Sequence, residues 1–381
     1  HGPVQNAIAM GNNARATGDG AIVIGGGALA EARVGQVISR NPADGRISLD
    51  YTKAPATNST VLGTGAKSQG TNNVVIGAGA LTSGAATAAT GTILLQDRNS
   101  TVVGASAASV RGWGTALGHR AAAYGYQTTA IGTGTYAVGT GSTAVGGWFD
   151  VNAAFGAAPS NPPAFGYGFG TNTPGLASQA FGANARTWGN YDTALGPAAR
   201  TSDFNSDAGV AYNSNDQTVI NGSLAAGFVA FAEGHASIAL GQQSRAHDAY
   251  AVALGSESIA WGIESLSIGH NAIASWHQDI AVGANAQALG GSGTGNIAFG
   301  TDALVDNATG GDTRDAIAMG TGARALADNA VAVGAGAEAS GLNAIASGQL
   351  ANASGESTSA YGNQSSASDD YPSAFGAFAY D

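Results

Sequence analysis

The strongest constraint on the fold is a phrase of 14 residues that returns along most of the chain. Small and apolar residues alternate up to a closing Gly, as in Ala236-Ser-Ile-Ala-Leu-Gly241 and Asn329-Ala-Val-Ala-Val-Gly334. Within six groups of closing glycines, every step is 14 residues long. The groups are Gly11 and Gly25, Gly63 and Gly77, Gly104 to Gly146, Gly182 and Gly196, Gly227 to Gly283, and Gly320 to Gly376. A fixed short period predicts stacked copies of one small unit rather than a compact enzyme.

Each unit is expected to contain strands and tight turns. Alternation with a period of two is the pattern of a β-strand, and Gly between the alternating stretches allows backbone conformations that other residues avoid. In the unit from Gly334 to Gly348, two alternating stretches are separated by Ser340-Gly341. The simplest unit is therefore two short strands joined by two turns, which is one coil of a β-solenoid.

Side-chain volume decides which residues lie inside the coil. Stacked sheets that carry ordinary side chains are separated by about 10 Å, and a coil of this length leaves a narrower interior. The composition fits, because the chain has 60 Gly and 81 Ala among 381 residues. We therefore expect Ala330, Ala332, Ala337 and Ala339 to point inward, and their larger neighbours to point outward.

On one strand of each coil the outward residues are large and apolar, so stacking would create a continuous apolar stripe. Monomeric proteins rarely expose such patches beyond a few hundred Å². Burying roughly 30 side chains at ~1.5–3 kcal/mol each would support obligate self-association. The predicted subunit interface consists of Ile238, Leu240, Val252, Leu254, Leu266, Ile268, Ile280, Val282, Ile317, Met319, Val331 and Val333.

The phrase and its period closely resemble the heads of trimeric autotransporter adhesins of Gram-negative bacteria, from about Asn6 to Gly376. The resemblance implies an all-β fold, a left-handed parallel β-roll of about twenty coils assembled as a homotrimer. It also implies one elongated head over residues 1–381, exported through the outer membrane to the cell surface. Such a head attaches bacteria to extracellular matrix proteins or host cells. We expect any stalk and membrane anchor to lie outside these residues.

The repeat is interrupted where the spacing between closing glycines exceeds 14 residues. The first interruption predicts a β-hairpin, with Val37–Arg40 and Arg46–Asp50 joined by a turn at Asn41–Gly45. Asp44 and Arg46 near this turn are candidate ligand contacts. The expected insertions are 26–57, 78–98, the aromatic and Pro-rich 147–177, 200–222, and an enlarged turn at 301–315. Such insertions either bind ligands or pack on a neighbouring subunit.

Apolar residues on the otherwise polar strand of the coil mark a candidate ligand site. Phe231, Ile259, Trp261, Ile273 and Leu289 fall at outward positions of consecutive coils. Aromatic residues surrounded by charges are typical of protein-binding surfaces. The alternative is that an insertion covers this patch. The charged neighbours are Glu233, Arg245 and His247, and Trp188 and Tyr124 are more isolated candidates.

Charge and composition exclude several other functions. The chain carries 25 acidic and 14 basic residues, a net charge of −11, which disfavours nucleic acid as a partner. It has no Cys and no apolar run long enough for direct membrane insertion by a helix. We expect no catalytic residues, cofactor or metal. Four acidic residues of one enlarged step lack the nonapeptide of Ca²⁺-binding rolls: Asp302, Asp306, Asp312 and Asp315.

Two other functions fit parts of the sequence. An ice-binding β-solenoid is suggested by four threonines on consecutive coils, Thr101, Thr115, Thr129 and Thr143. This row is short and lies on the predicted interface. A phage or cell-surface fibre that cleaves glycans would need a pair of clustered carboxylates in a groove. The sequence shows no such pair.

Overall fold

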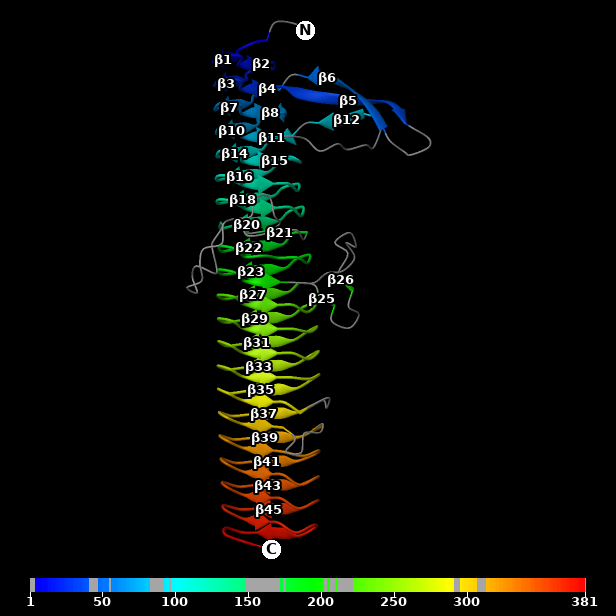
Figure 1. Cartoon of the computed structure of the whole chain (residues 1–381), viewed down its shortest axis with the longest axis vertical. Coiled ribbons are helices and arrows are strands. Elements are labelled where there is room, and N and C mark those ends of the chain that lie inside the picture. The colour runs from blue at the N-terminus through cyan, green and yellow to red at the C-terminus, as the bar shows by residue number, and fades with distance from the viewer. Residues whose placement is uncertain are drawn as a thin grey trace, which may run out of the picture. The chain divides into compact units, whose positions relative to one another are not determined.

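The 14-residue repeat folds as one coil of a parallel β-solenoid, as the alternation predicts. The structure is a computed structural model with two compact units, His1–Asp192 and Thr193–Asp381, and each is described by itself (Figure 1). A typical coil has one three-residue strand, the long strand, and one two-residue strand, the short strand. The described residues are 4–40, 47–54, 56–82, 92–95, 97–147, 172–173, 176–201, 204–205, 210–211, 222–290, 295–306 and 313–380.

In the first unit, each strand pairs in parallel with its counterpart in the next coil. The long strands are β1 (Ile8–Met10), β3 (Ile22–Ile24), β7 (Thr60–Leu62), β10 (Val74–Ile76), β14 (Thr101–Val103), β16 (Thr115–Leu117), β18 (Thr129–Ile131), β20 (Thr143–Val145) and β22 (Gln179–Phe181). The short strands are β2 (Arg15–Ala16), β4 (Leu29–Ala30), β8 (Lys67–Ser68), β11 (Leu81–Thr82), β15 (Ala108–Ser109), β17 (Ala122–Ala123), β19 (Tyr136–Ala137) and β21 (Asn172–Thr173).

The second unit repeats this arrangement. Its long strands are β23 (Thr193–Leu195), β27 (Leu224–Ala226), β29 (Ile238–Leu240), β31 (Val252–Leu254), β33 (Leu266–Ile268), β35 (Ile280–Val282), β37 (Ile297–Phe299), β39 (Ile317–Met319), β41 (Val331–Val333), β43 (Ile345–Ser347), β45 (Ser359–Tyr361) and β47 (Ser373–Phe375). Its short strands are β24 (Arg200–Thr201), β28 (Phe231–Ala232), β30 (Arg245–Ala246), β32 (Ile259–Ala260), β34 (Ile273–Ala274), β36 (Gln287–Ala288), β38 (Leu304–Val305), β40 (Arg324–Ala325), β42 (Glu338–Ala339), β44 (Asn352–Ala353) and β46 (Ser366–Ala367).

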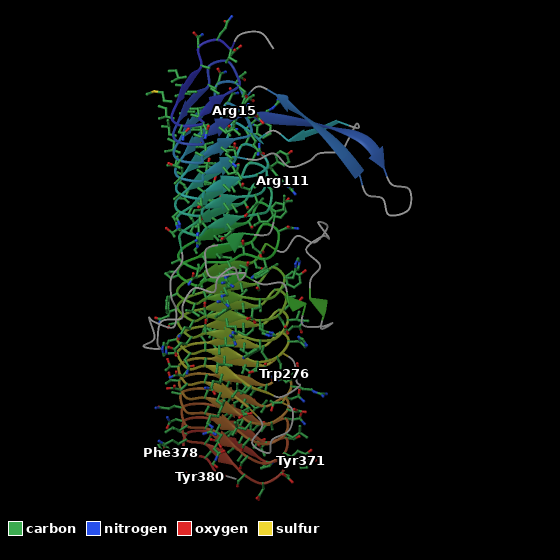
Figure 2. The ribbon with its side chains drawn as sticks, turned by 45° about the horizontal axis from the view of Figure 1, so that its top comes forward. Arg15, Arg111, Trp276, Tyr371, Phe378 and Tyr380 are labelled. Atoms are coloured by element: carbon green, nitrogen blue, oxygen red, sulfur yellow. The ribbon has the colours of Figure 1, made fainter. Side chains whose placement is uncertain are left out.

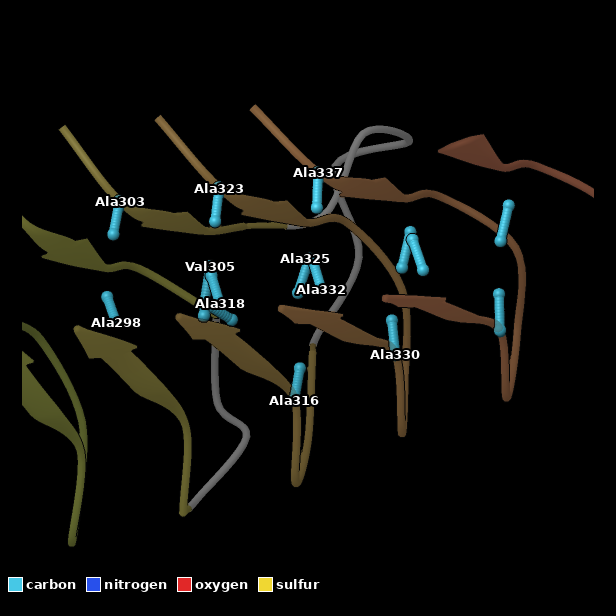
Figure 3. Packing of buried hydrophobic residues seen from close by; sticks show 14 of the residues in the cluster. Ala298, Ala303, Val305, Ala316, Ala318, Ala323, Ala325, Ala330, Ala332 and Ala337 are labelled. Atoms are coloured by element: carbon cyan, nitrogen blue, oxygen red, sulfur yellow. The ribbon is translucent and has the colours of Figure 1, made fainter. Parts of the chain in front are cut away.

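The interior of the coil is lined by alanine, which confirms the prediction from side-chain volume. Ala330, Ala332, Ala337 and Ala339 are all fully buried. Figure 3 shows alanines of the long-strand side, such as Ala316, facing alanines of the short-strand side across a thin interior. The large residues of both strands therefore point away from the interior. We name the two outer surfaces the long-strand face and the short-strand face.

The first corner, which follows each long strand, requires glycine for two reasons. Gly255 has a φ of +136°, a conformation that residues with a Cβ rarely adopt. A Cβ built on Gly255 would also lie 2.3 Å from the carbonyl oxygen of Gly269 in the next coil. Two residues further on, the chain takes the left-handed conformation that Asn tolerates well, as at Asn271 with a φ of 54°. The side-chain amide of Asn271 donates a hydrogen bond to Asn285 Oδ1 at 3.2 Å.

The second corner, which follows each short strand, contains buried polar groups that bond to the turn. Asp279 is fully buried in the second unit, and its carboxylate accepts hydrogen bonds from the backbone N–H groups of Trp276 (3.1 Å) and Asn296 (3.0 Å). Burial raises the pKa of Asp279 to about 6, while these hydrogen bonds act in the opposite direction. This position is therefore a buried carboxylate in a column that other coils fill with Ser, as at Ser237 and Ser265.

The insertions span fewer residues than the predicted bounds. Each leaves the coil at one corner, and the strands before and after that corner still form. Residues at the predicted ends belong to short strands or turns of the coil: Leu29–Ala30, Leu81–Thr82, Asn172–Thr173, Arg200–Thr201 and Leu304–Val305. The hairpin is formed by β5 (Ala32–Arg40) and β6 (Ile47–Ala54).

The first two insertions also meet, which the sequence gave no reason to expect. Strand β12 (Thr92–Leu95) pairs in antiparallel orientation with β5, with Leu95 opposite Arg33. Another strand near this insertion, β13 (Asp97–Arg98), pairs with β9 (Gly70–Thr71). The fourth insertion contains a small antiparallel pair, β25 (Phe204–Asn205) and β26 (Val210–Ala211).

Candidate functional site

The long-strand face carries in-register columns of outward apolar side chains. Ile238 stands opposite Val252 and Leu240 opposite Leu254, with a fully buried Ala between the two outward residues of each strand. Met319 and Phe299 on this face are 44% and 50% exposed in the isolated chain. The predicted interface residues Leu266, Ile268, Ile280, Val282, Ile317, Val331 and Val333 are half-buried at equivalent outward positions. The described part of the chain leaves this apolar face partly exposed.

The four threonines considered for ice binding do form an in-register column in the first unit. Thr101, Thr115, Thr129 and Thr143 are paired with one another through consecutive long strands. They lie on the long-strand face, and the other outward residue of each of these strands is aliphatic, as at Ile131. Self-association through this face would cover the threonines.

On the short-strand face of the second unit, the structure brings together most of the predicted ligand residues. Phe231, Arg245, Ile259 and Ile273 form one column, because β28, β30, β32 and β34 pair in register. Glu233, His247 and Trp261 occupy the second outward position of three of these coils. The backbone N–H of each donates a hydrogen bond to a carbonyl oxygen of the next coil, which continues the short strand. Neighbouring coils thus place these side chains side by side.

Two guanidinium groups stack on the aromatic rings of this surface. The Cζ atom of Arg245 lies 5.3 Å from the ring centroid of Phe231 and 5.7 Å from that of Trp261. Arg200, in the preceding coil, places its Cζ 5.6 Å from the Phe231 centroid. Such cation–π contacts hold guanidinium groups in place while leaving their N–H edges for other partners. We call Arg200, Phe231, Arg245, His247 and Trp261 the Arg–aromatic ladder.

His247 links the ladder to two carboxylates. Its ring lies 4.8 Å from Trp261 between centroids, its Nδ1 lies 3.0 Å from Asp248 Oδ1, and its Nε2 lies 3.6 Å from Glu233 Oε2. The imidazole is therefore fixed from three sides. The ladder combines aromatic rings, donors and acceptors on a partly exposed surface, which suits recognition of a ligand rather than catalysis.

The remaining predicted residues lie elsewhere. Trp188 belongs to the first unit and is 50% exposed. Asp44, Arg46 and Asp312 lie outside the described residues. Asp302 is in a first-corner turn and accepts a hydrogen bond from Asn285. Over the described part of the chain, no three potential metal ligands come together.

Sequence reasoning missed a second aromatic surface, on the short-strand side of the first unit. It consists of Trp113, Tyr124, Tyr126, Tyr136 and Val138, which we call the Tyr–Trp patch. The residues are spread over 26 positions of the sequence, and Tyr124 alone looked isolated. Writing the repeats in rows of 14 would have placed them in three adjacent rows, which is the signal that could have identified them.

Comparison with known proteins identifies the repeat. A family model described as the YadA head domain repeat matches the chain several times, at residues 5–28, 54–80, 114–135, 123–147, 232–258, 262–286, 314–337 and 339–365. Among solved structures, the chain is similar to the crystal structure of the collagen-binding domain of the Yersinia adhesin YadA, at 26% identity and a TM-score of 0.26. That alignment covers 37% of this chain and 65% of the other, which is less than two thirds of its length.

No curated protein matches the chain. Among the residues that the structure describes, no helix has the length and apolar character needed to cross a membrane.

Proposed function

Because the chain belongs to the family of trimeric autotransporter adhesin heads, built from YadA head repeats, we propose that it is a non-enzymatic adhesin head. In this proposal three copies form a homotrimer at the surface of a Gram-negative bacterium, after export through the outer membrane. The trimer attaches the bacterium to extracellular matrix proteins or to host cells. The whole of residues 1–381 acts as one head.

The observation that carries this proposal is the apolar long-strand face. Its side chains form uninterrupted columns from Ile238 to Val333, and the interior has no room for them because it is filled with alanine. A face of this kind is stable in water only when another surface covers it. A second and third copy of the same chain present matching columns at the same height, which explains a symmetric assembly.

Self-association through the long-strand face supports multivalent binding. The Arg–aromatic ladder is on the short-strand face, so it stays accessible when the long-strand faces meet. Three copies of the ladder on one trimer would give avidity from weak individual contacts. We propose that Phe231, Arg245, His247 and Trp261 contact the ligand, with Ile259 and Ile273 extending the apolar part of this surface.

The test is binding of the head to immobilised collagens, fibronectin and laminin and to epithelial cells. We expect the native head to bind at least one of these, and Trp261→Ala to weaken that binding about tenfold by removing the central ring of the ladder. Trp276→Ala is the matched control, because Trp276 is 38% exposed and Trp261 is 36% exposed, on neighbouring coils. Equal binding by the native head and Trp261→Ala would exclude the ladder, and no binding to any surface would contradict the adhesive function.

A further inference from the structure

The Tyr–Trp patch exposes more aromatic surface than the fold requires. Trp113 is 52% exposed, Tyr124 41%, Tyr136 38% and Val138 41%. These residues follow one another on three consecutive coils, because β15, β17 and β19 pair in register. Scattered exposed apolar residues are ordinary, but a contiguous group is a mark of an interaction surface.

The rings of the patch form two pairs. Tyr124 and Tyr136 are nearly parallel, with an interplanar angle of 7° and centroids 6.4 Å apart. Trp113 and Tyr126 are inclined at 42° with centroids 6.3 Å apart. The neighbouring short-strand position is Ala122, which is almost completely buried and adds no bulk beside the rings. The patch is therefore a group of adjacent, partly exposed aromatic rings.

Trp113 occupies a turn position that does not favour a bulky residue. Its φ is 52°, in the left-handed region, where the adjacent coils have Asn99 and Gln127 and the coil after them Gly141, although Tyr191, Tyr250 and Tyr371 hold the same position in more distant coils. A bulky residue in this region costs of order 1–2 kcal/mol relative to Gly, and such strain is a reason to look for a function. Trp113 gains only partial burial in return, since about half of it stays exposed.

The residues around the patch carry positive charge, whereas the whole chain carries a net negative charge. Residues 98–149 contain Arg98, Arg111 and Arg120 but no Asp or Glu, although the whole chain has a net charge of −11. Arg111 and Arg120 are exposed, and no described carboxylate lies within ion-pair distance of either. Arg111 lies on the short-strand side of the first unit, and Figure 2 labels it. Trp113 and Tyr126 lie in second-corner turns, as Arg111 does, whereas Arg120 lies in a first-corner turn, two residues after Gly118. This surface therefore combines aromatic rings with one cation, Arg111, that pairs with no described carboxylate.

We propose that the Tyr–Trp patch binds an acidic polysaccharide, independently of the Arg–aromatic ladder. Flat aromatic rings stack on the C–H faces of pyranose rings, and consecutive coils repeat every ~4.8 Å, about the length of one sugar along a glycan chain. The Arg111 guanidinium donates hydrogen bonds to the carboxylate or sulfate groups of the polymer. Nucleic acid fits poorly, because its phosphates are closely spaced and need more cations than this patch supplies.

The experiment measures binding of the head to hyaluronan, which carries carboxylates, to chondroitin sulfate, which also carries sulfates, and to uncharged dextran. We expect binding to at least one of the two acidic polymers and none to dextran. Trp113→Asn restores the residue type found in the preceding coil, so it keeps the fold, and it should weaken binding about tenfold by removing one ring. Arg111→Gln should weaken binding and reduce its salt dependence.

Two matched controls separate this site from general charge attraction and from the adhesive function. Tyr250→Asn removes an exposed aromatic residue with a φ of 60° from the second unit, and Arg324→Gln removes an exposed cation there. Neither change should alter binding to the acidic polymers. The proposal is overturned if the native head binds neither polymer, if Trp113→Asn binds as the native head does, or if Arg324→Gln has the effect of Arg111→Gln. It is also overturned if an acidic peptide competes as well as the glycan. Binding to matrix proteins would survive all these results.

Discussion

Replacing Gly255 by Ala tests the reason for which every coil closes on glycine. A φ of +136° is close to inaccessible to residues with a Cβ, at a cost of about 1–3 kcal/mol. The new Cβ would also meet the carbonyl oxygen of Gly269 at 2.3 Å and its carbonyl carbon at 2.6 Å. Relieving such contacts by moving packed backbone costs about 1–3 kcal/mol more. We therefore expect the unfolding free energy to fall by about 2–6 kcal/mol per chain.

Gly322 provides the matched control, because only one of the two reasons applies to it. Its φ is 65°, and a Cβ there would have no atom within 4 Å. Gly322→Ala should then cost about 1–2 kcal/mol for the left-handed backbone alone. Gly322→Asn should cost a few tenths of a kcal/mol at most, since Asn tolerates this conformation and Asn285 has a φ of 55° at the equivalent position.

The assay is thermal unfolding of the three variants, followed by circular dichroism. For a unit of this size each kcal/mol corresponds to about 2–4 °C, so Gly255→Ala should lower the midpoint by about 5–20 °C. The order of the three midpoints is the decisive result. If Gly255→Ala and Gly322→Ala were equally stable, the close approach of the corner glycines would not limit the packing of the coils, and the reasoning would be wrong.

Two further substitutions test the interface and the buried carboxylate. Leu254→Asp places a charge on each copy of the apolar face, so we expect light scattering to report monomers, whereas Ile259→Asp on the short-strand face of the adjoining coil should leave the oligomer intact. A trimeric Leu254→Asp variant would refute the interface. The raised pKa of Asp279, about 6 against 3.8, means that its charged form is disfavoured in the fold, so its destabilising effect is full above pH 6 and is lost as the pH falls towards 4. The difference of about 2 units corresponds to about 3 kcal/mol. The native head should gain stability from pH 7 to pH 4 relative to Asp279→Asn, and parallel pH profiles of the two midpoints would show that the pKa is not raised.

The fold could be predicted from the sequence because the repeat and the side-chain volumes impose the same geometry. Alternation fixed the strands, and the abundance of Ala fixed which residues face inward, so the outward position of Val331 and Val333 followed. The insertions were placed less well. A gap between glycines gives the number of extra residues but not the corner at which they leave the coil. The pairing of β12 with β5 joins residues about 60 positions apart in the sequence, and no local pattern encodes it.

The candidate site was partly predictable for a related reason. The neighbours of an outward residue are those 14 positions away, so Phe231, Arg245 and Ile259 could be placed in one column by counting. Counting did not show that Arg245 also contacts Trp261, because that contact joins the first outward position of one coil to the second outward position of the next. The opposite diagonal, from the second outward position of one coil to the first of the next, joins Tyr124 to Tyr136, which is why Tyr124 looked isolated in the sequence.

The same geometry explains where binding surfaces can arise on this solenoid. Inward positions accept mostly small residues, corner glycines such as Gly255 meet the next coil too closely for a Cβ, and the long-strand face must stay apolar to be covered. The outward positions of the short strand carry none of these constraints, so their side chains can change at little cost to the fold. Departures from small polar residues at these positions therefore need another explanation. Arg245 with Trp261, and Tyr124 with Tyr136, are departures of this kind that also contact one another across coils. That contact between independent repeats is the strongest structural reason to test these two surfaces for binding.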